Sequence, residues 1–477
     1  MGETDNYERQ HTVTEFSDAT VRSLADRVRG TVLEPGDDGY DEARSIWNGM
    51  IDRRPSLVIR CTGTADVVAA VDLARETGAD VSIHGGGHNV SGSAVADGGL
   101  MIDLSSMDGV HVDPEAGTVR VGAGALLGDV DHETQLFGLA TPLGVVAETG
   151  VAGLTLNGGY GHLSREYGLA ADNLREVDIV TADGEVRTAS EDEHRDLFWA
   201  VRGGGGNFGV VTSLEYELHE VGPEVAQLFV WYPADEARER MATFREWTES
   251  APRHVAVLPF LAQVPDEEPF PEAAWGEPAL VFFGCYRGDP AAFDDVVGPL
   301  TDGDPIADLS ERTRFEELQA LLDEDYPDGL RYYWKSLYLA DLGDEVVDLM
   351  VRYNESAPSD LSTVDIWWLG GAVADVPQDA TAFWHRDKPF MLTFEANWED
   401  ADADDANVAW AREGFAVAEE LAVSGGRYGN FPGFAEDPAH LLFGENYDRL
   451  VDIKTRYDPE NLFHLNQNIA PRTEGDS

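Results

Sequence analysis

The stretch HGGGHNVSG occupies residues 84–92 and directly follows the short apolar run ADVSI at 79–83. The run predicts a β-strand, and the glycines at 85–87 allow the backbone after it to turn and to approach a bound group closely. Backbone N–H groups in such a turn are suited to binding phosphate. His88 follows these glycines directly, which makes it a candidate to contact a ligand held by the same loop.

Two further glycine-rich stretches have the same character: GVAGLTLNGGYG at 150–161 and GGGGNFG at 203–209. The second contains the spacing G-x-G-x-x-G, but it follows a predicted helix and precedes a predicted strand. A dinucleotide fingerprint requires the opposite order, strand and then helix, so a Rossmann site is rejected. No stretch ends in the Lys-Ser/Thr pair of a P-loop, which argues against ATP chemistry.

Around these stretches the chain alternates short strands and helices up to about residue 221. SLVIRC at 56–61 predicts a strand, and Thr64 is expected to cap a helix over 65–77. Asp183-Gly184 lies between VDIVTA and EVRTAS, which predicts a two-residue hairpin. This block is therefore predicted to be α+β.

A second block begins after Gly222-Pro223. Its runs VAQLFVWY, ALVFFGCY, VDIWWLGGAV and FMLTFEANW predict the strands of one larger antiparallel sheet with a ligand-facing side. Helices are expected over 234–249 and 406–424, and another over 445–456 in the C-terminal part.

The composition restricts the class of protein. A chain of 477 residues with 43% hydrophobic content predicts two folded domains and excludes a disordered or collagen-like chain. No apolar run reaches 18 residues and the first residues do not resemble an export signal, so a cytoplasmic protein is expected. Two cysteines are too few for a disulfide framework or a structural zinc site, and no metal is expected.

The charge is strongly negative, with 90 acidic against 33 basic residues and a formal net charge of −57. Such a surface repels phosphate backbones and anionic membranes, so neither nucleic acid nor a membrane is an expected partner. The chain has only three lysines (Lys335, Lys388 and Lys454), and its acids are spread over its whole length. This even, lysine-poor acidity resembles that of salt-adapted haloarchaeal proteins.

Five motifs in order resemble the berberine-bridge-enzyme-like FAD-linked oxidoreductases, within the vanillyl-alcohol-oxidase superfamily with its PCMH-type FAD-binding domain. They are RRPSLVIRCTGTADVVAAV, HGGGHNVSGSAVADGGLMIDLSSM, GVAGLTLNGGYGHLSREYGLAADNL, DLFWAVRGGGGNFGVVTSLEYEL and YDPENLFHLNQNIAP. The resemblance covers about 53–221 and 431–471, and it is looser in between.

The resemblance implies an α+β fold with a two-subdomain FAD-binding domain and an inserted substrate domain, an antiparallel sheet backed by helices. The expected boundaries are an N-terminal lead-in at 1–50, the FAD-binding domain at 51–222, the substrate domain at 223–430 and a C-terminal segment at 431–477 that returns to the FAD-binding domain. In this fold the glycine loops hold the pyrophosphate, so no Rossmann motif is needed.

The resemblance also implies the cofactor contacts. His88 matches the histidine that bonds covalently to the flavin 8α-methyl. The other expected FAD contacts are Gly85, Gly86, Gly87, Asn89, Ser91, Thr149, Gly150, Gly153, Thr155, Gly158, Gly159, Gly161, Val211, Asn430, Asn466 and Asn468. Which of the two tail asparagines lies nearer the flavin is left open.

The sequence departs from the family pattern at two positions. Val146 stands where many members carry a second, cysteinyl flavin link, so that link is not expected here. Phe431 replaces the second tyrosine of the family's Y-x-N-Y segment, which is a catalytic base in several members. Tyr428 and Glu395 are the remaining candidates for the base.

The implied reaction moves a hydride from an alcohol-type carbon of a small molecule, such as a sugar or secondary alcohol, to flavin N5, while a general base takes the hydroxyl proton. Thr149 matches the family position that controls oxygen access, and its size favours an oxidase that produces hydrogen peroxide. A dehydrogenase with another acceptor, or a flavin-fold protein that only binds a ligand, are the alternatives.

Overall fold

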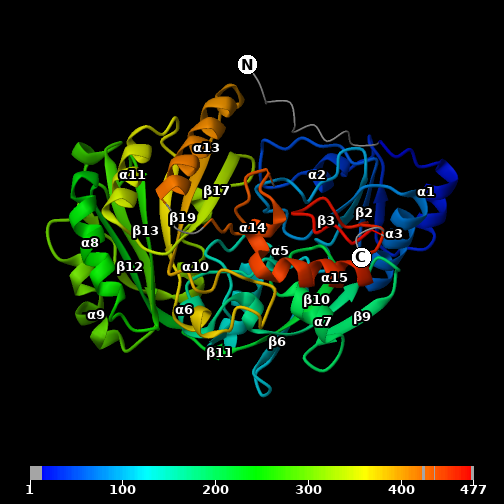
Figure 1. Cartoon of the computed structure of the whole chain (residues 1–477), viewed down its shortest axis with the longest axis horizontal. Coiled ribbons are helices and arrows are strands. Elements are labelled where there is room, and N and C mark those ends of the chain that lie inside the picture. Colours follow the sequence, from blue (N-terminus) through cyan, green and yellow to red (C-terminus); the bar gives the residue numbers. More distant parts are fainter. Residues whose placement is uncertain (1–12, 422–424, 435, 474–477) are drawn as a thin grey trace.

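Three main sheets organise the chain, and they lie in two halves of the computed structural model (Figure 1). The structure describes residues 13–421, 425–434 and 436–473. Two smaller sheets and the C-terminal helix α15 form one half, and an eight-stranded sheet with its helices forms the other. This arrangement confirms the predicted α+β class and the antiparallel sheet backed by helices.

The first sheet carries the strand that ends at the HGGGHNVSG loop. Its order is β1-β2-β4-β3, and β2, β4 and β3 run parallel. Helix α3 connects β2 to β3, and it begins after Gly63, which is its N-cap, so the prediction that Thr64 caps this helix is wrong. The bounds are β1 Thr31–Leu33, β2 Leu57–Arg60, β3 Val81–His84, β4 Leu100–Asp103 and α3 Thr64–Thr77.

The second sheet is antiparallel, in the order β5-β6-β10-β8-β9. The turn at Asp183-Gly184 joins β8 to β9, which confirms the predicted hairpin. Helices α3, α7 and α15 supply side chains to the same apolar core as both of these sheets. The bounds are β5 Val110–Asp113, β6 Thr118–Gly122, β8 Leu174–Val180, β9 Val186–Ser190, β10 Val210–Glu217, α7 Arg195–Val201 and α15 Tyr447–Tyr457.

The eight-stranded antiparallel sheet has the order β15-β12-β14-β13-β18-β19-β17, with β16 pairing with β12. It contains all four strands predicted after residue 222, and also β13 and β17, which the sequence reading did not include. Its bounds are β12 Glu224–Pro233, β13 Val255–Gln263, β14 Pro278–Tyr286, β15 Ala307–Asp308, β16 Glu311–Arg314, β17 Arg331–Leu339, β18 Thr363–Trp368 and β19 Phe390–Trp398.

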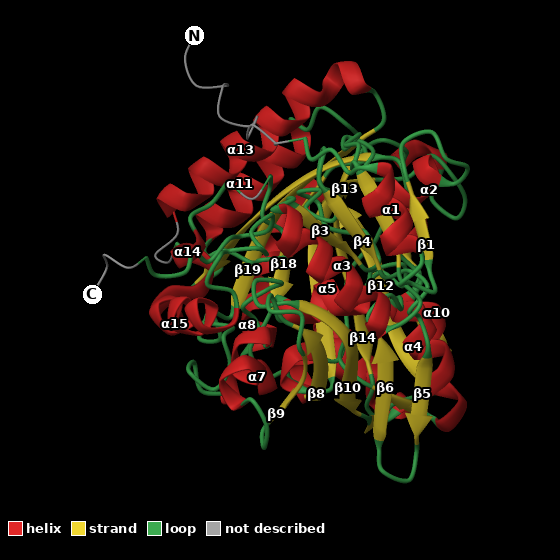
Figure 2. Cartoon of the chain, turned by 90° about the vertical axis from the view of Figure 1, so that its right-hand side faces the viewer, coloured by secondary structure: helices red, strands yellow, loops and turns green. Residues whose placement is uncertain are grey.

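Helices α8 (Ala237–Thr248), α11 (Asp344–Glu355) and α13 (Asp404–Leu421) cover one face of this sheet (Figures 1 and 2). Their apolar residues and alternate residues of the strands form one buried core. The opposite face of the sheet is directed toward the glycine-rich loops. Helices α8 and α13 were predicted and α11 was not; the predicted end of α13 at Ser424 lies outside the described residues.

The remaining elements connect these layers. A two-stranded sheet pairs β7 (Leu139–Ala140) with β11 (His219–Glu220). None of the helices in the described part of the chain is long and apolar enough to cross a lipid bilayer. The other α-helices are α1 Asp18–Ala25, α2 Tyr40–Arg44, α4 Leu127–Thr134, α5 Val151–Leu156, α6 Ser164–Tyr167, α9 Phe293–Thr301, α10 Phe315–Gln319, α12 Ala372–Asp375 and α14 Ala439–Phe443.

Candidate active site

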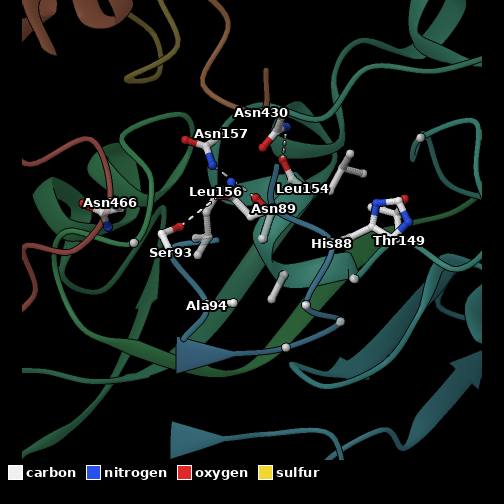
Figure 3. A pocket seen from close by; sticks show the side chains of 18 of the residues that line it. His88, Asn89, Ser93, Ala94, Thr149, Leu154, Leu156, Asn157, Asn430 and Asn466 are labelled. Atoms are coloured by element: carbon white, nitrogen blue, oxygen red, sulfur yellow. Dashed lines mark hydrogen bonds between the residues drawn. The ribbon is translucent and has the colours of Figure 1, made fainter. Parts of the chain in front are cut away.

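A large cavity lies between the glycine-rich loops and the uncovered face of the eight-stranded sheet. Its walls are formed by the glycine-rich stretches, the large sheet and the C-terminal tail, which are the segments that contain the predicted site residues. The loops after β3 and before α5 line one side, and β17, β18 and β19 line the other. The C-terminal tail contributes residues 463–467. Figure 3 shows part of this cavity, with residues of the first two glycine stretches and the tail around it.

The first two glycine stretches touch each other through their backbones. A Cβ atom added to Gly86 would lie 2.5 Å from the Cα of Gly150, which is closer than such atoms approach. Both positions therefore require glycine. The contact brings the loop at 84–92 against the start of α5, and backbone from both stretches reaches the cavity.

The side chain of Asn89 is fixed within its own loop. Its Oδ1 atom accepts hydrogen bonds from the Ser91 backbone N–H at 3.1 Å, from the Ser91 hydroxyl and from the Ser93 hydroxyl at 3.1 Å. The bond to Ser93 is drawn in Figure 3. These bonds order the loop around His88, so its backbone presents a fixed surface to the cavity.

His88 is oriented by stacking. Its ring lies 4.1 Å from that of Trp47, with 19° between the planes, and Trp47 in turn stacks on Tyr332 at 3.6 Å. Burial lowers the pKa of His88 to about 4, so the imidazole is neutral at pH 7. The Nε2 atom of His88 is buried and has no hydrogen-bond partner. A neutral ring with an unused nitrogen at a cavity wall is chemically suited to bond to a ligand.

Most of the sequence-predicted site residues meet in this cavity. Those that line it are Gly85, Gly86, Gly87, His88, Asn89, Thr149, Gly150, Gly153, Val211, Glu395, Tyr428, Asn430 and Asn466. The residues that do not line it are Ser91, Thr155, Gly158, Gly159, Gly161 and Asn468.

The residues outside the cavity wall support it from behind. The Thr155 hydroxyl forms a hydrogen bond with that of Tyr216 at 2.8 Å, which ties α5 to β10. Gly161 packs against the backbone of residues 143–144, where a Cβ atom would lie 2.2 Å from the Leu143 carbonyl oxygen. Of the two tail asparagines, Asn466 is the one at the cavity, and its buried Oδ1 has no hydrogen-bond partner.

Tyr428 presents a buried hydroxyl group to the cavity. The hydroxyl oxygen accepts a hydrogen bond from Asn430 Nδ2 at 2.9 Å, and the nearby backbone N–H groups of Gly159 and Tyr160 also act to lower its pKa. Burial raises the pKa of Tyr428 to about 12 even with these three donors. The phenol is therefore protonated at neutral pH, and its own O–H group is available to a substrate.

Glu395 lies on the same side of the cavity as a second carboxyl group, Asp365. Glu395 Oε2 accepts a hydrogen bond from the Tyr326 hydroxyl, and Oε1 accepts one from the Thr393 hydroxyl, both at 3.1 Å. Burial raises the pKa of Glu395 to about 7. Burial and the adjacent Glu395 charge raise the pKa of Asp365 well above its usual value.

Among the residues of this wall that sequence reasoning missed are Asp365, Tyr326 and Trp334. Asp365 carried a signal, because it interrupts the apolar strand VDIWW at a position whose neighbours, Val364 and Ile366, face the helix-side core. An acid on the opposite face of a buried strand is directed toward the cavity. Tyr326 and Trp334 carried no such signal. Trp334 reaches the site only through the long-range pairing of β17 with β19, and Tyr326 reaches it from the loop before β17.

Neither cysteine lies at the cavity. Val146, which is 8% exposed, lines the cavity. Cys61 and Cys285 are buried and do not belong to the cavity wall. Within the described ranges, no group of three or more His, Cys, Asp or Glu residues is arranged to hold a metal ion.

Comparison with known proteins identifies the family. Residues 55–190 match the FAD binding domain model, and residues 427–470 match the model described as berberine and berberine like. The chain is 32% identical over 461 residues to (R)-6-hydroxynicotine oxidase of Paenarthrobacter nicotinovorans, covering 93% of this chain and 97% of the relative. It is 30% identical over 456 residues to an FAD-linked oxidoreductase of Dictyostelium discoideum, covering 94% and 97%.

Solved structures agree with these matches. The crystal structure of 6-hydroxy-D-nicotine oxidase from Arthrobacter nicotinovorans superimposes with a TM-score of 0.84 at 29% identity, over 93% of this chain and 98% of the other. The chain belongs to the berberine-bridge-like family of FAD-linked oxidoreductases, and it is an FAD-dependent enzyme.

The residues present fit FAD. The close backbone contact between Gly86 and Gly150 leaves main-chain groups, rather than side chains, at the cavity, as a phosphate cradle requires. The buried, unpartnered Nε2 of His88 and Oδ1 of Asn466 are polar atoms that a bound group would satisfy. His88 and the glycines would therefore hold the cofactor beside the carboxyl and tyrosine groups of the large sheet.

Proposed function

We propose that this protein oxidises the CH–OH carbon of a small alcohol or sugar and passes the electrons to oxygen, giving hydrogen peroxide. When bound, FAD supplies the hydride acceptor. The observation that carries the proposal is that Glu395 and Tyr428 line the same cavity as His88 and the glycine loops. A hydroxyl group placed between them would meet a proton acceptor and a hydrogen-bond donor.

The proposed domain division follows the sequence boundaries: a lead-in at 1–50, an FAD-binding domain at 51–222, a substrate domain at 223–430 and a returning C-terminal segment at 431–477. In support, the tail is held against the third glycine stretch. Asn207 Oδ1 accepts a hydrogen bond from the backbone N–H of Ile469 at 3.0 Å, and Lys454 Nζ donates to the Asn207 carbonyl at 2.8 Å.

The covalent bond between His88 and the flavin 8α-methyl is part of the proposal. Forming it requires a neutral imidazole with a free nitrogen lone pair. The lowered pKa of His88 and its unpartnered Nε2 support both conditions. No cysteinyl bond accompanies it, since position 146 is valine.

Glu395 is the better proton acceptor of the two sequence candidates. A general base works best when its pKa lies near the working pH. The pKa of Glu395 is about 7, whereas that of Tyr428 is about 12, so only the carboxyl is ionised to a useful extent in neutral solution. Tyr428 then has the role of holding the substrate oxygen through its O–H group.

Glu395→Gln tests this assignment. Anaerobic mixing with an alcohol that reduces the wild type should show flavin bleaching slowed by a factor of about 10² to 10⁴, because the proton acceptor is lost. In the wild type the bleaching rate should rise with pH through about 7, as the Glu395 carboxyl loses its proton. Tyr428→Phe should slow bleaching less and keep the rise with pH. An unchanged rate in Glu395→Gln would assign the base elsewhere.

The proposal that oxygen is the electron acceptor is based on Thr149, which lines the cavity within the turn before α5. Its compact side chain leaves room for oxygen. Reduced wild-type flavin is expected to reoxidise within seconds of mixing with air-saturated buffer, as stopped-flow absorbance would record. Reoxidation over minutes, with rapid reaction toward an artificial dye, would instead identify a dehydrogenase. A flavin that no alcohol or sugar bleaches would favour a ligand-binding role without catalysis.

A further inference from the structure

Asp365 and Glu395 are adjacent acids on neighbouring strands. In the pairing of β18 with β19, Asp365 lies opposite Thr393 and Glu395 lies opposite Thr363, so the two acids are diagonal neighbours on one face of the sheet. Their carboxyl groups are within hydrogen-bonding range of each other. Asp365 is 3% exposed and Glu395 is 2% exposed, and both line the cavity.

None of the described residues supplies a counter-ion to this pair. No lysine or arginine is among the described residues that line the cavity, and no cation in that part of the chain acts on either carboxyl. Three side chains from other elements face the pair. Tyr326, in the loop before β17, donates a hydrogen bond to Glu395, Trp334 of β17 lies opposite Glu395, and Phe260 of β13 lies opposite Asp365. None of these carries a positive charge, and Asp325, which acts on Tyr326, adds a negative one.

One oxygen of the Asp365 carboxyl lacks a hydrogen-bond donor in the protein. Asp365 Oδ1 is buried and has no hydrogen-bond partner. An unpaired polar atom in a buried wall costs free energy unless a ligand satisfies it. The oxygen that remains free in the protein therefore marks the point where a ligand donates a hydrogen bond.

Aromatic side chains surround this point. Trp334 meets Tyr326 edge to face at 5.5 Å and meets Phe431 in the same way at 5.2 Å, and Trp367 lies 5.7 Å from Phe431. All four rings line the cavity. Aromatic faces attract organic cations, and a carboxylate among such rings adds an opposite charge for an ammonium group.

We propose that Asp365 and Glu395 form a recognition site for a protonated amine, so that the substrate is an alcohol that also carries an ammonium group. The inference rests on the proposed function and narrows its substrate class. The ammonium group lies against Asp365 Oδ1, which leaves Glu395 to receive the hydroxyl proton. A positive charge beside the pair favours the ionised form of both carboxyls, so binding of the amine also prepares Glu395 as the base.

Protonated 2-(dimethylamino)ethanol and 3-methylbutan-1-ol test the proposal, because they have nearly the same shape and only the first carries a positive charge and an N–H group. Their dissociation constants are measured with the flavin-loaded protein in molar KCl, by calorimetry and by the change in flavin absorbance. The high salt screens attraction by the acidic surface, since the Debye length is then about 3 Å. At pH 8.5 the protonated amine should bind at least roughly tenfold more tightly than its neutral analogue.

The pH dependence and two variants make the test specific. At pH 6 the advantage of the amine should shrink, because Glu395, whose pKa is about 7, is then mostly protonated, and the raised pKa of Asp365 also favours its neutral form. The double variant Asp365→Asn with Glu395→Gln should lose the preference at both pH values. Asp131→Asn removes a buried carboxyl away from this cavity, on α4, and should keep the preference.

Equal binding of the two probes at pH 8.5 by the wild type would overturn the inference. The same result in a protein whose flavin is bleached by neutral alcohols would leave the proposed function intact. A protein that binds no flavin would instead contradict the proposed function, and calorimetry with the two probes would still decide the amine site. If the double variant loses its flavin, the single Asp365→Asn variant replaces it, and the preference for the charged probe should be smaller in that variant than in the wild type. The pH dependence of the wild type then provides the second measurement.

Discussion

The position of His88 depends on a stack of three rings from three separate parts of the chain. Trp47 lies between His88 and Tyr332, and Asn48 beside it donates hydrogen bonds to the carbonyls of Val90 and Tyr332 at 2.8 and 2.9 Å. The residues just before position 50 thus connect the histidine loop to the large sheet. A lead-in segment that seemed peripheral in the sequence helps to fix the proposed flavin-bonding residue.

His88→Ala is expected to abolish covalent attachment of the flavin. Wild-type protein precipitated with acid should stay yellow, because the flavin is bonded to the ring, whereas the variant should release its flavin into the supernatant. His132→Ala, at an exposed histidine of α4, should behave like the wild type. Yellow colour in the wild-type supernatant would contradict the proposed bond.

At the scale of the elements, α15 and the tail after it act through one buried ion pair. Lys454 Nζ donates to Asp458 at 2.6 Å, and both side chains are fully buried. Lys454 also donates to the carbonyls of Asn207 and Phe463, each at 2.8 Å. Asp458 accepts backbone N–H groups from Leu462 and Phe463. This network holds the tail against the glycine stretch at 203–209.

Lys454→Met should lower the free energy of unfolding by about 3–5 kcal/mol, because it leaves the Asp458 carboxylate buried without its cation. Urea unfolding in constant molar KCl would measure the change. Lys388→Met is the matched control: its partner Asp387 is 51% exposed, so the loss should stay below about 1 kcal/mol. Similar losses in the two variants would show that the Lys454 network does not hold the tail.

The whole molecule carries a formal net charge of −57. Ion pairs between neighbouring residues cannot cancel it, because acidic residues far outnumber basic ones. Mutual repulsion among the surface acids disfavours the folded state in dilute buffer. Salt screens that repulsion, and it also weakens the exposed ion pairs, but such pairs contribute little individually. The balance predicts that this protein is more stable in concentrated salt.

Raising KCl from dilute buffer to molar concentration should therefore raise the melting temperature by about 10 °C or more. Differential scanning calorimetry or flavin fluorescence would record the transition. Glycine betaine at equal concentration, which does not screen charge, serves as the control and should raise it much less. A melting temperature that is independent of KCl would show that the acidic surface is not a salt adaptation.

The sequence by itself determined the local parts of this protein. The glycine stretches, the hairpin at Asp183-Gly184 and the alternating strands of the second block are encoded within short windows, and the five motifs sufficed for the FAD-linked family. Strands β13 and β17 were not predicted because each contains a residue that is unusual inside a buried strand. Pro259 lies inside β13, whose pairing with β18 is confined to Phe260 and Leu261. Lys335 lies inside β17 and reaches Asp437 at 2.5 Å.

Only the tertiary structure decided which side chains meet at the cavity. Tyr326, Asp365, Glu395 and Tyr428 are far apart in the chain, and strand register and loop packing bring them together. A shift of one residue between β18 and β19 would separate the two acids, because successive side chains point to opposite faces of a sheet. The raised pKa values of both acids arise from burial and mutual proximity, which no short stretch of sequence contains.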